Sequence, residues 1–130
     1  MSTRWQRAYD RDDYRCIYCG EPLWEDLRIF HSATEDHLYP RWPKNTDRQG
    51  EDSDENVVPA CQLCNSLKAD YVPAIATNSG VLVQTARGRW EVAPQWRDDY
   101  IQQVREKIDE RKNERKKLFD AERQRIQRGA

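Results

Sequence analysis

The sequence predicts an α+β fold: a small unit of strands and a helix stapled by a four-cysteine zinc site, with an added β-hairpin and a long C-terminal α-helix. Three observations support this prediction. Two Cys-x-x-Cys pairs flank residues 20–60, short strand-like segments lie between and after these pairs, and the chain becomes strongly helical after Pro94. With 130 residues, the chain is long enough for one domain and short for two.

The composition indicates a thin hydrophobic core. Hydrophobic residues make up 37% of the chain and charged residues 35%, so we expect the core to need a staple. The net charge is −1, and a nucleic-acid site must therefore be a local basic patch. No apolar run has the length of a membrane span, and the N-terminal residues lack a signal-peptide core. We expect a cytoplasmic protein with no membrane partner.

The cysteines Cys16, Cys19, Cys61 and Cys64 form two pairs with the spacing of metal ligands. In the cytosol, such pairs bind a metal more often than they form disulfides. Gly20 follows the first pair and permits the positive φ of a tight turn. Four thiolates leave no open position, so we expect a structural zinc ion that supplies about 10–16 kcal/mol of apparent folding free energy. Two redox dithiols, or unrelated thiols, are the alternative.

Helical spacing begins near the N-terminus. Trp5 and Tyr9 lie on one face of an amphipathic helix predicted within residues 2–13. Ser2 or Thr3 can cap this helix.

Strand patterns surround the middle of the chain. We expect a short strand at residues 28–31 and another at 34–39 that stops at Pro40. A further strand at 56–59 should pair antiparallel with the segment 34–39. Residues 61–70 then read as a helix.

Between the cysteine pairs lies a second group of chemically active side chains. Asp36 and Asn65 offer hard oxygen ligands, which suit Mg²⁺ or Mn²⁺ better than zinc. His37 has the pKa range of a general base. Lys68 shares a helix face with Asn65 and adds positive charge for a phosphodiester. Adjacent residues of a regular strand face opposite sides, so we expect an irregular strand end near Pro40.

Residues 41–55 are predicted to form a long surface loop, which is a functional or mobile feature in most proteins. The acidic end of this loop should face away from any polyanion; it contains Glu51, Asp52, Asp54 and Glu55.

Further contacts are less sharply defined. Residues 81–92 alternate around a Gly-containing turn and predict a β-hairpin. Arg87 and Arg89 at its tip, and Arg41 in the preceding loop, are candidate phosphate contacts, although a solvated turn explains the hairpin arginines equally well. His31 could be a metal ligand or a nucleic-acid contact, but a packed or surface histidine is the favoured interpretation.

The C-terminal helix has two halves. An apolar stripe that breaks after Ile108 predicts that the first half packs on the domain, and the second half projects towards DNA, a second subunit or a partner protein. A plain solvated helix is the alternative. The stripe consists of Trp96, Tyr100, Ile101, Val104 and Ile108, and resumes weakly at Leu118, Phe119 and Ile126.

Residues 10–70 resemble the HNH endonucleases, nucleases of the ββα-metal fold. The resemblance is carried by the two cysteine pairs, by Asp36-His37-Leu38-Tyr39-Pro40, and by the segment 54–68, which includes Asn56 and Asn65. It implies that His37 activates the attacking water, that Asn56 fixes the loop and orients His37, and that Asp36 and Asn65 ligate a catalytic Mg²⁺ or Mn²⁺. The implied products carry a 5′-phosphate and a 3′-hydroxyl.

The chain departs from the family pattern at two positions. Asn65 stands where the third letter of the motif has histidine, and Gly50 alone represents a pair of glycines. We expect residues 1–70 to form the nuclease core with its zinc knuckles, and residues 71–130 to add the hairpin and helix, in a single domain overall.

The leading functional hypothesis is a metal-dependent endonuclease that acts on DNA, expected to be double-stranded, and is encoded by a bacterium or phage. The alternative is a non-catalytic zinc-binding module that contacts nucleic acid or protein. Phage packaging, restriction or defence, and mobile elements are all open as the biological setting.

Overall fold

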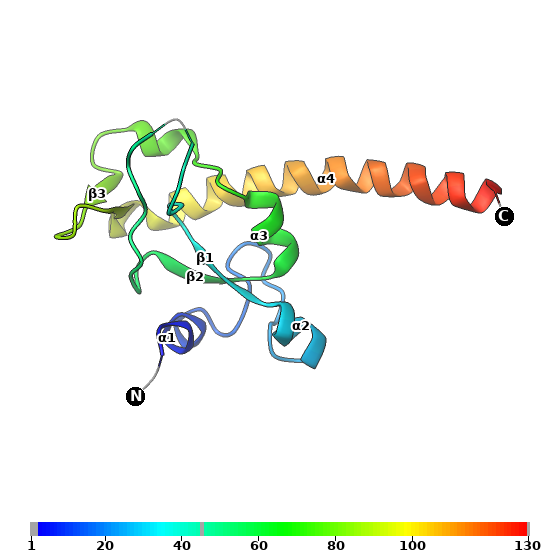
Figure 1. Ribbon diagram of the computed structural model, residues 1–130, viewed down its shortest axis with the longest axis horizontal. Coiled ribbons are helices and arrows are strands. Elements are labelled where there is room, and N and C mark those ends of the chain that lie inside the picture. The colour runs from blue at the N-terminus through cyan, green and yellow to red at the C-terminus, as the bar shows by residue number, and fades with distance from the viewer. Residues whose placement is uncertain (1–2, 45, 130) are drawn as a thin grey trace.

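The computed structural model describes residues 3–44 and 46–129, and it confirms the α+β class. At its centre, β1 (Thr34–His37) pairs antiparallel with β2 (Val57–Ala60), and Thr34 lies opposite Ala60. The helix α3 (Gln62–Lys68) follows β2 directly and packs beside β1. Figure 1 shows this strand–strand–helix unit with the other elements arranged around it. The predicted antiparallel pairing and the following helix are therefore confirmed.

The N-terminal helix α1 (Arg4–Arg11) packs against β2. Thr3 caps it: the Thr3 hydroxyl accepts a hydrogen bond from the Gln6 backbone, and the Gln6 side chain accepts one from the Thr3 backbone. This reciprocal arrangement satisfies two backbone donors that a helix start leaves unpaired. Of the two expected caps, Ser2 lies outside the described residues. Tyr9 is buried against the core, as the apolar spacing predicted.

Residues 28–31 are helical, so the strand expected there is wrong. They belong to α2 (Leu27–Ser32). Asp26 is its N-cap, with a carboxylate oxygen 2.7 Å from the backbone nitrogen of Arg28 and 3.1 Å from that of Ile29. Such a cap stabilises a helix start by about 1 kcal/mol.

The hairpin consists of β3 (Leu82–Gln84) and β4 (Trp90–Val92), and follows the short 3-10 helix η1 (Ala74–Thr77). It supports the end of the loop after β1. The Glu51 backbone nitrogen donates to the Trp90 carbonyl at 2.8 Å, and the Trp90 nitrogen donates to the Gln49 carbonyl at 2.8 Å. The predicted hairpin is confirmed, and its structural role is to hold the returning arm of that loop.

The C-terminal helix α4 (Arg97–Gly129) follows the short 3-10 helix η2 (Pro94–Trp96) and has 33 residues. Its first half packs on the body, where the Tyr100 hydroxyl donates to the Leu38 carbonyl at 3.0 Å. Figure 1 shows the second half continuing beyond the body as an isolated rod. Three apolar side chains on this projecting half are 58–61% exposed: Leu118, Phe119 and Ile126. The expected division into a packed and a projecting half is confirmed. Within the described residues, the helices lack the combination of length and apolar character needed to cross a bilayer.

Candidate active site and cysteine cluster

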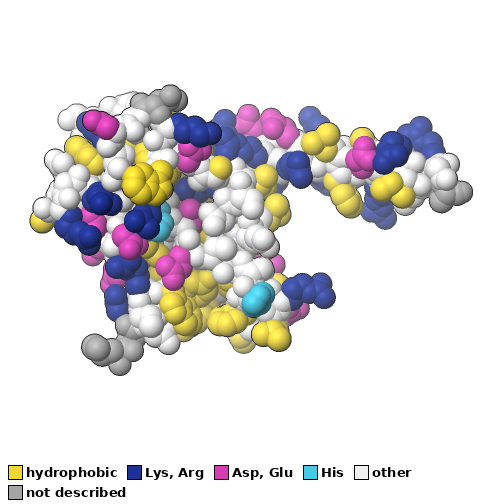
Figure 2. Space-filling model, in the orientation of Figure 1, with side chains coloured by type: hydrophobic (Ala, Val, Ile, Leu, Met, Phe, Trp, Pro, Cys, Tyr) yellow, Lys and Arg dark blue, Asp and Glu magenta, His cyan; other side chains and the backbone are white. Residues whose placement is uncertain are grey.

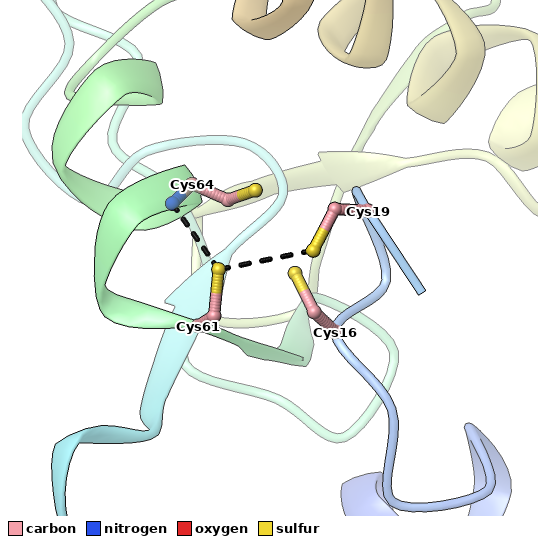
Figure 3. A group of neighbouring side chains, drawn as sticks. All are labelled: Cys16, Cys19, Cys61 and Cys64. Atoms are coloured by element: carbon pink, nitrogen blue, oxygen red, sulfur yellow. Dashed lines mark hydrogen bonds between the residues drawn. The ribbon is translucent and has the colours of Figure 1, made fainter. Parts of the chain in front are cut away.

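The four cysteine thiols converge on one point, as Figure 3 shows. Their Sγ atoms all lie within 4.8 Å of one another, and those of Cys19 and Cys61 are 3.9 Å apart. A tetrahedral zinc ion with bonds of about 2.3 Å places its sulfur ligands about 3.8 Å apart, so the cluster has the size of a zinc site. All four cysteines are free thiols. The donor set and the spacing therefore fit the expected structural metal, and His31 takes no part in the cluster because it lies on α2.

The local fold explains how the second cysteine pair reaches the cluster. Cys61 is the N-cap of α3, and its Sγ accepts a hydrogen bond from the Cys64 backbone nitrogen at 3.4 Å. The positive end of the helix favours thiolates at this position. Hydrogen bonds from the other three thiols hold the pKa of Cys16 well below its usual range. A metal ion binds cysteines as thiolates and displaces their protons. A cluster in which a thiol loses its proton readily is therefore suited to bind a metal ion.

A lysine from α4 adds positive charge beside the cluster. Burial lowers the pKa of Lys112, but Cys64, Cys19 and Cys61 together raise it more, so that the net shift of the pKa is upwards. Because four thiolates around a divalent ion leave an excess of negative charge, this ammonium offsets part of it. The contact also joins the packed half of α4 to the cysteine cluster.

His37 ends β1, and its side chain is 20% exposed. Its Nε2 lies 3.0 Å from a carboxylate oxygen of Asp52, and Arg4 of α1 pairs with the same carboxylate at 2.6 Å. The Arg4 guanidinium, and then His37, hold the pKa of Asp52 below its usual range. An Arg4–Asp52–His37 chain of polar contacts therefore crosses the surface from α1 to β1.

The position of Asp52 corrects the expectation that the acidic end of the loop faces away from the site. Asp54 pairs with Arg7 at 2.6 Å, and the Glu51 side chain is 6% exposed and accepts from the Thr85 hydroxyl. The loop was expected to project its charges outwards. It instead turns back over α1, so that Asp52 and Asp54 meet the arginines of that helix, while Glu51 contacts the hairpin.

Asn56 is the residue that turns the loop back. It is 1% exposed, and its side-chain oxygen accepts from the Tyr39 nitrogen at 2.9 Å. Its amide nitrogen donates to the carbonyls of Tyr39 at 3.0 Å and Glu51 at 2.7 Å. Its backbone carbonyl accepts from the Leu38 nitrogen at 2.8 Å. These bonds tie the segment after His37 to the segment that carries Asp52, so one buried amide sets the relation between the two.

Asp36 lies in a different environment from its neighbour. The residue is 7% exposed, and its carboxylate accepts a hydrogen bond from the Tyr18 hydroxyl and pairs with the Lys68 ammonium at 3.1 Å. Lys68 is 1% exposed and also donates to the His37 carbonyl at 2.9 Å. β1 ends at His37, two residues before the end of the strand expected over 34–39, and its pairing with β2 is regular up to that residue. Asp36 and His37 therefore point to opposite faces and have separate partners.

Asn65 contacts the same β1–α3 interface as Lys68. Its side-chain nitrogen donates to the Thr34 hydroxyl at 3.0 Å, and Thr34 lies on the same face of β1 as Asp36 because side chains alternate along a strand. Each group has a protein partner: Asp36 pairs with Lys68, and the Asn65 amide donates to Thr34. Carboxylate and amide oxygens are ligands that hard divalent cations prefer, and such an ion would have to displace the Lys68 ammonium from Asp36.

The other candidate phosphate contacts lie on the surface. Arg41 is exposed in the loop after β1, and Arg87 is 73% exposed at the hairpin tip, where it lies 3.6 Å from Glu51. Arg89 is half-buried next to β4. Lys68 differs from these arginines, since its ammonium is enclosed with Asp36. Figure 2 shows Lys and Arg side chains distributed over this face of the body.

Two site residues were not singled out from the sequence. Tyr18 lies between the first two cysteines, and burial together with Asp36 raises its pKa well above the usual range. Its position inside the cysteine motif gave no sign that it would face Asp36. Asp52 is one of several acidic residues in the loop, and only the turn made by Asn56 distinguishes it from the others.

Residues 16–70 match the family model described as HNH endonuclease. They contain the cysteine cluster together with Asp36, His37, Asp52, Asn56 and Asn65. This segment of the chain is therefore similar to the HNH endonucleases.

One curated relative comes from Bacillus subtilis (strain 168) and bears the name "SPbeta prophage-derived putative HNH endonuclease YoqL". It is 33% identical over 70 residues, which are 53% of this chain and 29% of that protein. The chain therefore spans less than a third of this relative's length. No solved structure matches the chain.

Proposed function

We propose that the chain is a metal-dependent endonuclease that hydrolyses DNA phosphodiester bonds, with His37 as the general base. The observation that carries the proposal is the end of β1, where a 20% exposed imidazole is held by the Asp52 carboxylate. The match of residues 16–70 to the HNH endonucleases supports it. The prophage origin in the relative's name supports a phage or bacterial source.

Asp52 determines which imidazole nitrogen takes the proton. When Nε2 donates its hydrogen to Asp52, Nδ1 carries the lone pair that accepts a proton from water. The carboxylate then stabilises the imidazolium, since the opposite charges lie 3.0 Å apart. Asn56 holds the segments that carry both groups. A positioned base of this kind contributes about 10²–10⁴-fold to a reaction rate.

A divalent ion, Mg²⁺ or Mn²⁺, is proposed at the β1–α3 interface with Asp36 and Asn65 as protein ligands. When bound, such an ion would stabilise the charge on the phosphate and on the leaving oxygen. The assignment is supported by the carboxylate and the amide that lie at this interface.

The decisive experiment incubates supercoiled plasmid with the zinc-loaded protein, with and without added Mg²⁺ or Mn²⁺. We expect nicked plasmid only when a divalent ion is added. DNA ligase should reseal the nick, because ligation requires the 5′-phosphate and 3′-hydroxyl that the proposal implies. His37→Ala protein, purified in parallel, controls for contaminating nucleases. Absence of nicking in every metal, with zinc fully bound, would contradict the proposal.

Metal binding is tested separately by the electron paramagnetic resonance signal of free Mn²⁺. We expect Asp36→Asn and Asn65→Ala to leave more Mn²⁺ in solution than the parent protein does. Asp47→Asn, which changes an exposed carboxylate of the loop, is the matched control. Unchanged Mn²⁺ binding in both site variants would contradict the assignment of Asp36 and Asn65 as ligands. The role of His37 would still be tested by the plasmid assay.

The second candidate function is a non-catalytic zinc-binding module that contacts nucleic acid or protein. It is favoured by one observation: the Lys68 ammonium neutralises Asp36, the carboxylate that a catalytic metal requires. Zinc-loaded protein that binds DNA without cleaving it in any divalent metal would support this candidate.

A further inference from the structure

An aromatic pocket opens between α1, α2 and the first residues of β1. Its volume is about 340 Å³. The rings meet edge to face, with centroids 5.7 Å apart for Trp5 and Tyr9 and 6.5 Å apart for Trp5 and Phe30. Figure 2 shows hydrophobic side chains gathered over α1 and α2. The lining residues are Trp5, Tyr9, Phe30, Ala33, Thr34 and Glu35.

The pocket lies beside the His37 site. Glu35 and His37 are two residues apart on β1 and therefore occupy the same face of the strand, about 7 Å from each other along it. Asp36, between them, faces α3 instead. Arg4, which holds Asp52 against His37, directly precedes Trp5 in α1. Neighbouring residues of α1 and β1 therefore form both the wall of the pocket and the polar contacts at His37.

The lining of the pocket selects against a phosphate group. It contains one charged side chain, the Glu35 carboxylate, and neither Lys nor Arg. A carboxylate repels a phosphate, but it accepts hydrogen bonds from an amino group. The aromatic walls favour a flat apolar face. The matching occupant is flat, carries an amino group on its edge, and belongs to a molecule whose phosphate reaches His37.

We propose that this pocket receives one unpaired, amino-bearing base of the DNA substrate, next to the phosphate at His37. The base stacks on the aromatic side chains, and its exocyclic amino group donates to Glu35. Cytosine, adenine and guanine carry such an amino group, whereas thymine lacks it. A base in an intact duplex is stacked and paired, so the pocket takes a base that is extruded, bulged or in single-stranded DNA. This proposal rests on the proposed DNA substrate.

The test measures binding by fluorescence anisotropy, without divalent metal so that no strand is cut. Labelled duplexes of one sequence carry either no bulge, a single bulged cytosine or a single bulged thymine. We expect the cytosine bulge to bind at least about fivefold more tightly than the perfect duplex, the low end of what one stacked base contributes. The thymine bulge should show a smaller preference.

Two substitutions attribute the preference to the pocket. Phe30→Ala should remove the preference for the bulge; Phe30 is 45% exposed, so the fold tolerates its loss. Phe119→Ala, at a 60% exposed ring on the projecting half of α4, is the matched control and should keep it. Glu35→Gln should bring the cytosine and thymine bulges closer together.

The outcomes separate this proposal from the proposed function. Protein that nicks plasmid but binds all three duplexes equally would overturn the pocket proposal alone, as would a preference that survives Phe30→Ala. Protein that neither nicks plasmid nor binds any duplex would overturn both. An RNA bulge bound more tightly than the same bulge in DNA would also overturn the assignment to a DNA base.

Discussion

The two neighbouring side chains at the end of β1 lie in opposite environments. Asp36 is enclosed with Tyr18 and Lys68, whereas His37 is 20% exposed and contacts Asp52 at the surface. The strand geometry requires this division, because consecutive side chains alternate in direction. Charge pairs that are buried affect folding far more than those at the surface. We therefore expect the loss of Lys68, the buried partner of Asp36, to act mainly on stability and the loss of His37 to act mainly on activity.

Removal of zinc should have the largest effect, because it should unfold the strand end and with it the separate environments of Asp36 and His37. The segment between the first two cysteines holds Tyr18 against Asp36 and donates from the Ile17 nitrogen to the Pro59 carbonyl at 3.0 Å. Structural zinc contributes about 10–16 kcal/mol of apparent free energy in small domains. Chelation should eliminate cooperative thermal unfolding followed by circular dichroism, and added Zn²⁺ should restore it at one ion per chain. An unchanged melting curve after complete zinc removal would contradict this expectation.

His37→Ala should separate activity from stability. We expect plasmid nicking to slow by about 10²–10⁴-fold, the contribution of a positioned general base. The free energy of unfolding in urea should change by less than about 1 kcal/mol, since the imidazole is partly exposed and its partner is a surface carboxylate. His31→Ala changes the other histidine of the chain, on α2, and should leave both measurements unaltered. Equal nicking rates for His37→Ala and the parent would rule out this residue as the base.

Lys68→Met tests the buried side of the strand. The substitution leaves the Asp36 carboxylate without its cation, and breaking a buried pair in this way costs about 3–5 kcal/mol. Urea denaturation should show this loss in the free energy of unfolding. Lys116→Met breaks an exposed pair with Asp120 on α4 and serves as the control, with a change within about 0.5 kcal/mol. Similar losses for both variants would show that the burial of Lys68 has no energetic consequence.

Asp52→Asn should give the smallest effect, and one that depends on pH. Arg4 and His37 hold the pKa of Asp52 below its usual range. The stabilisation is therefore fully present above the unfolded-state pKa, about 3.9, and is lost as pH falls through the lower folded-state pKa. The urea midpoint of unfolding should be measured from pH 3 to pH 6 for Asp52→Asn and for the parent. The two midpoints should differ near pH 6 and converge near pH 3.

A matched substitution controls for the loss of any loop carboxylate. Asp47→Asn alters an exposed residue of the same loop and should not show this convergence. A difference between Asp52→Asn and the parent that grew as the pH fell would contradict the sign of the expected effect.

The parts of the fold that the sequence predicted are those encoded by local patterns. Cysteine spacing predicted the cluster, and the apolar stripe predicted which half of α4 is packed. Residues 28–31 were assigned incorrectly because their apolar character fits a strand as well as a helix, and the Asp26 cap decides between them.

The partners of the candidate site residues were harder to predict. The sequence indicated Asp36 and His37 as a pair, but their partners come from distant segments: Tyr18 from the cysteine motif, Lys68 from α3 and Asp52 from the loop. These contacts depend on where the chain folds back, and on the three hydrogen bonds that the Asn56 side chain makes. The periodic spacing of apolar residues indicates local helices and strands, but it does not indicate where the chain folds back. The assignment of Asp36 and Asn65 as metal ligands and of His37 as base stays a prediction.

Gly50 closes the loop that leaves β1. Its nitrogen donates to the Pro40 carbonyl at 3.0 Å, and a Cβ atom at this position would overlap the carbonyl oxygens of Tyr39 and Pro40. The two arms of the loop therefore touch at its base, and only the residue without a side chain permits that approach. Because both arms are held at this point, a side chain at position 50 would push them apart. It would thereby shift Asp52, two residues further along, relative to its partner His37.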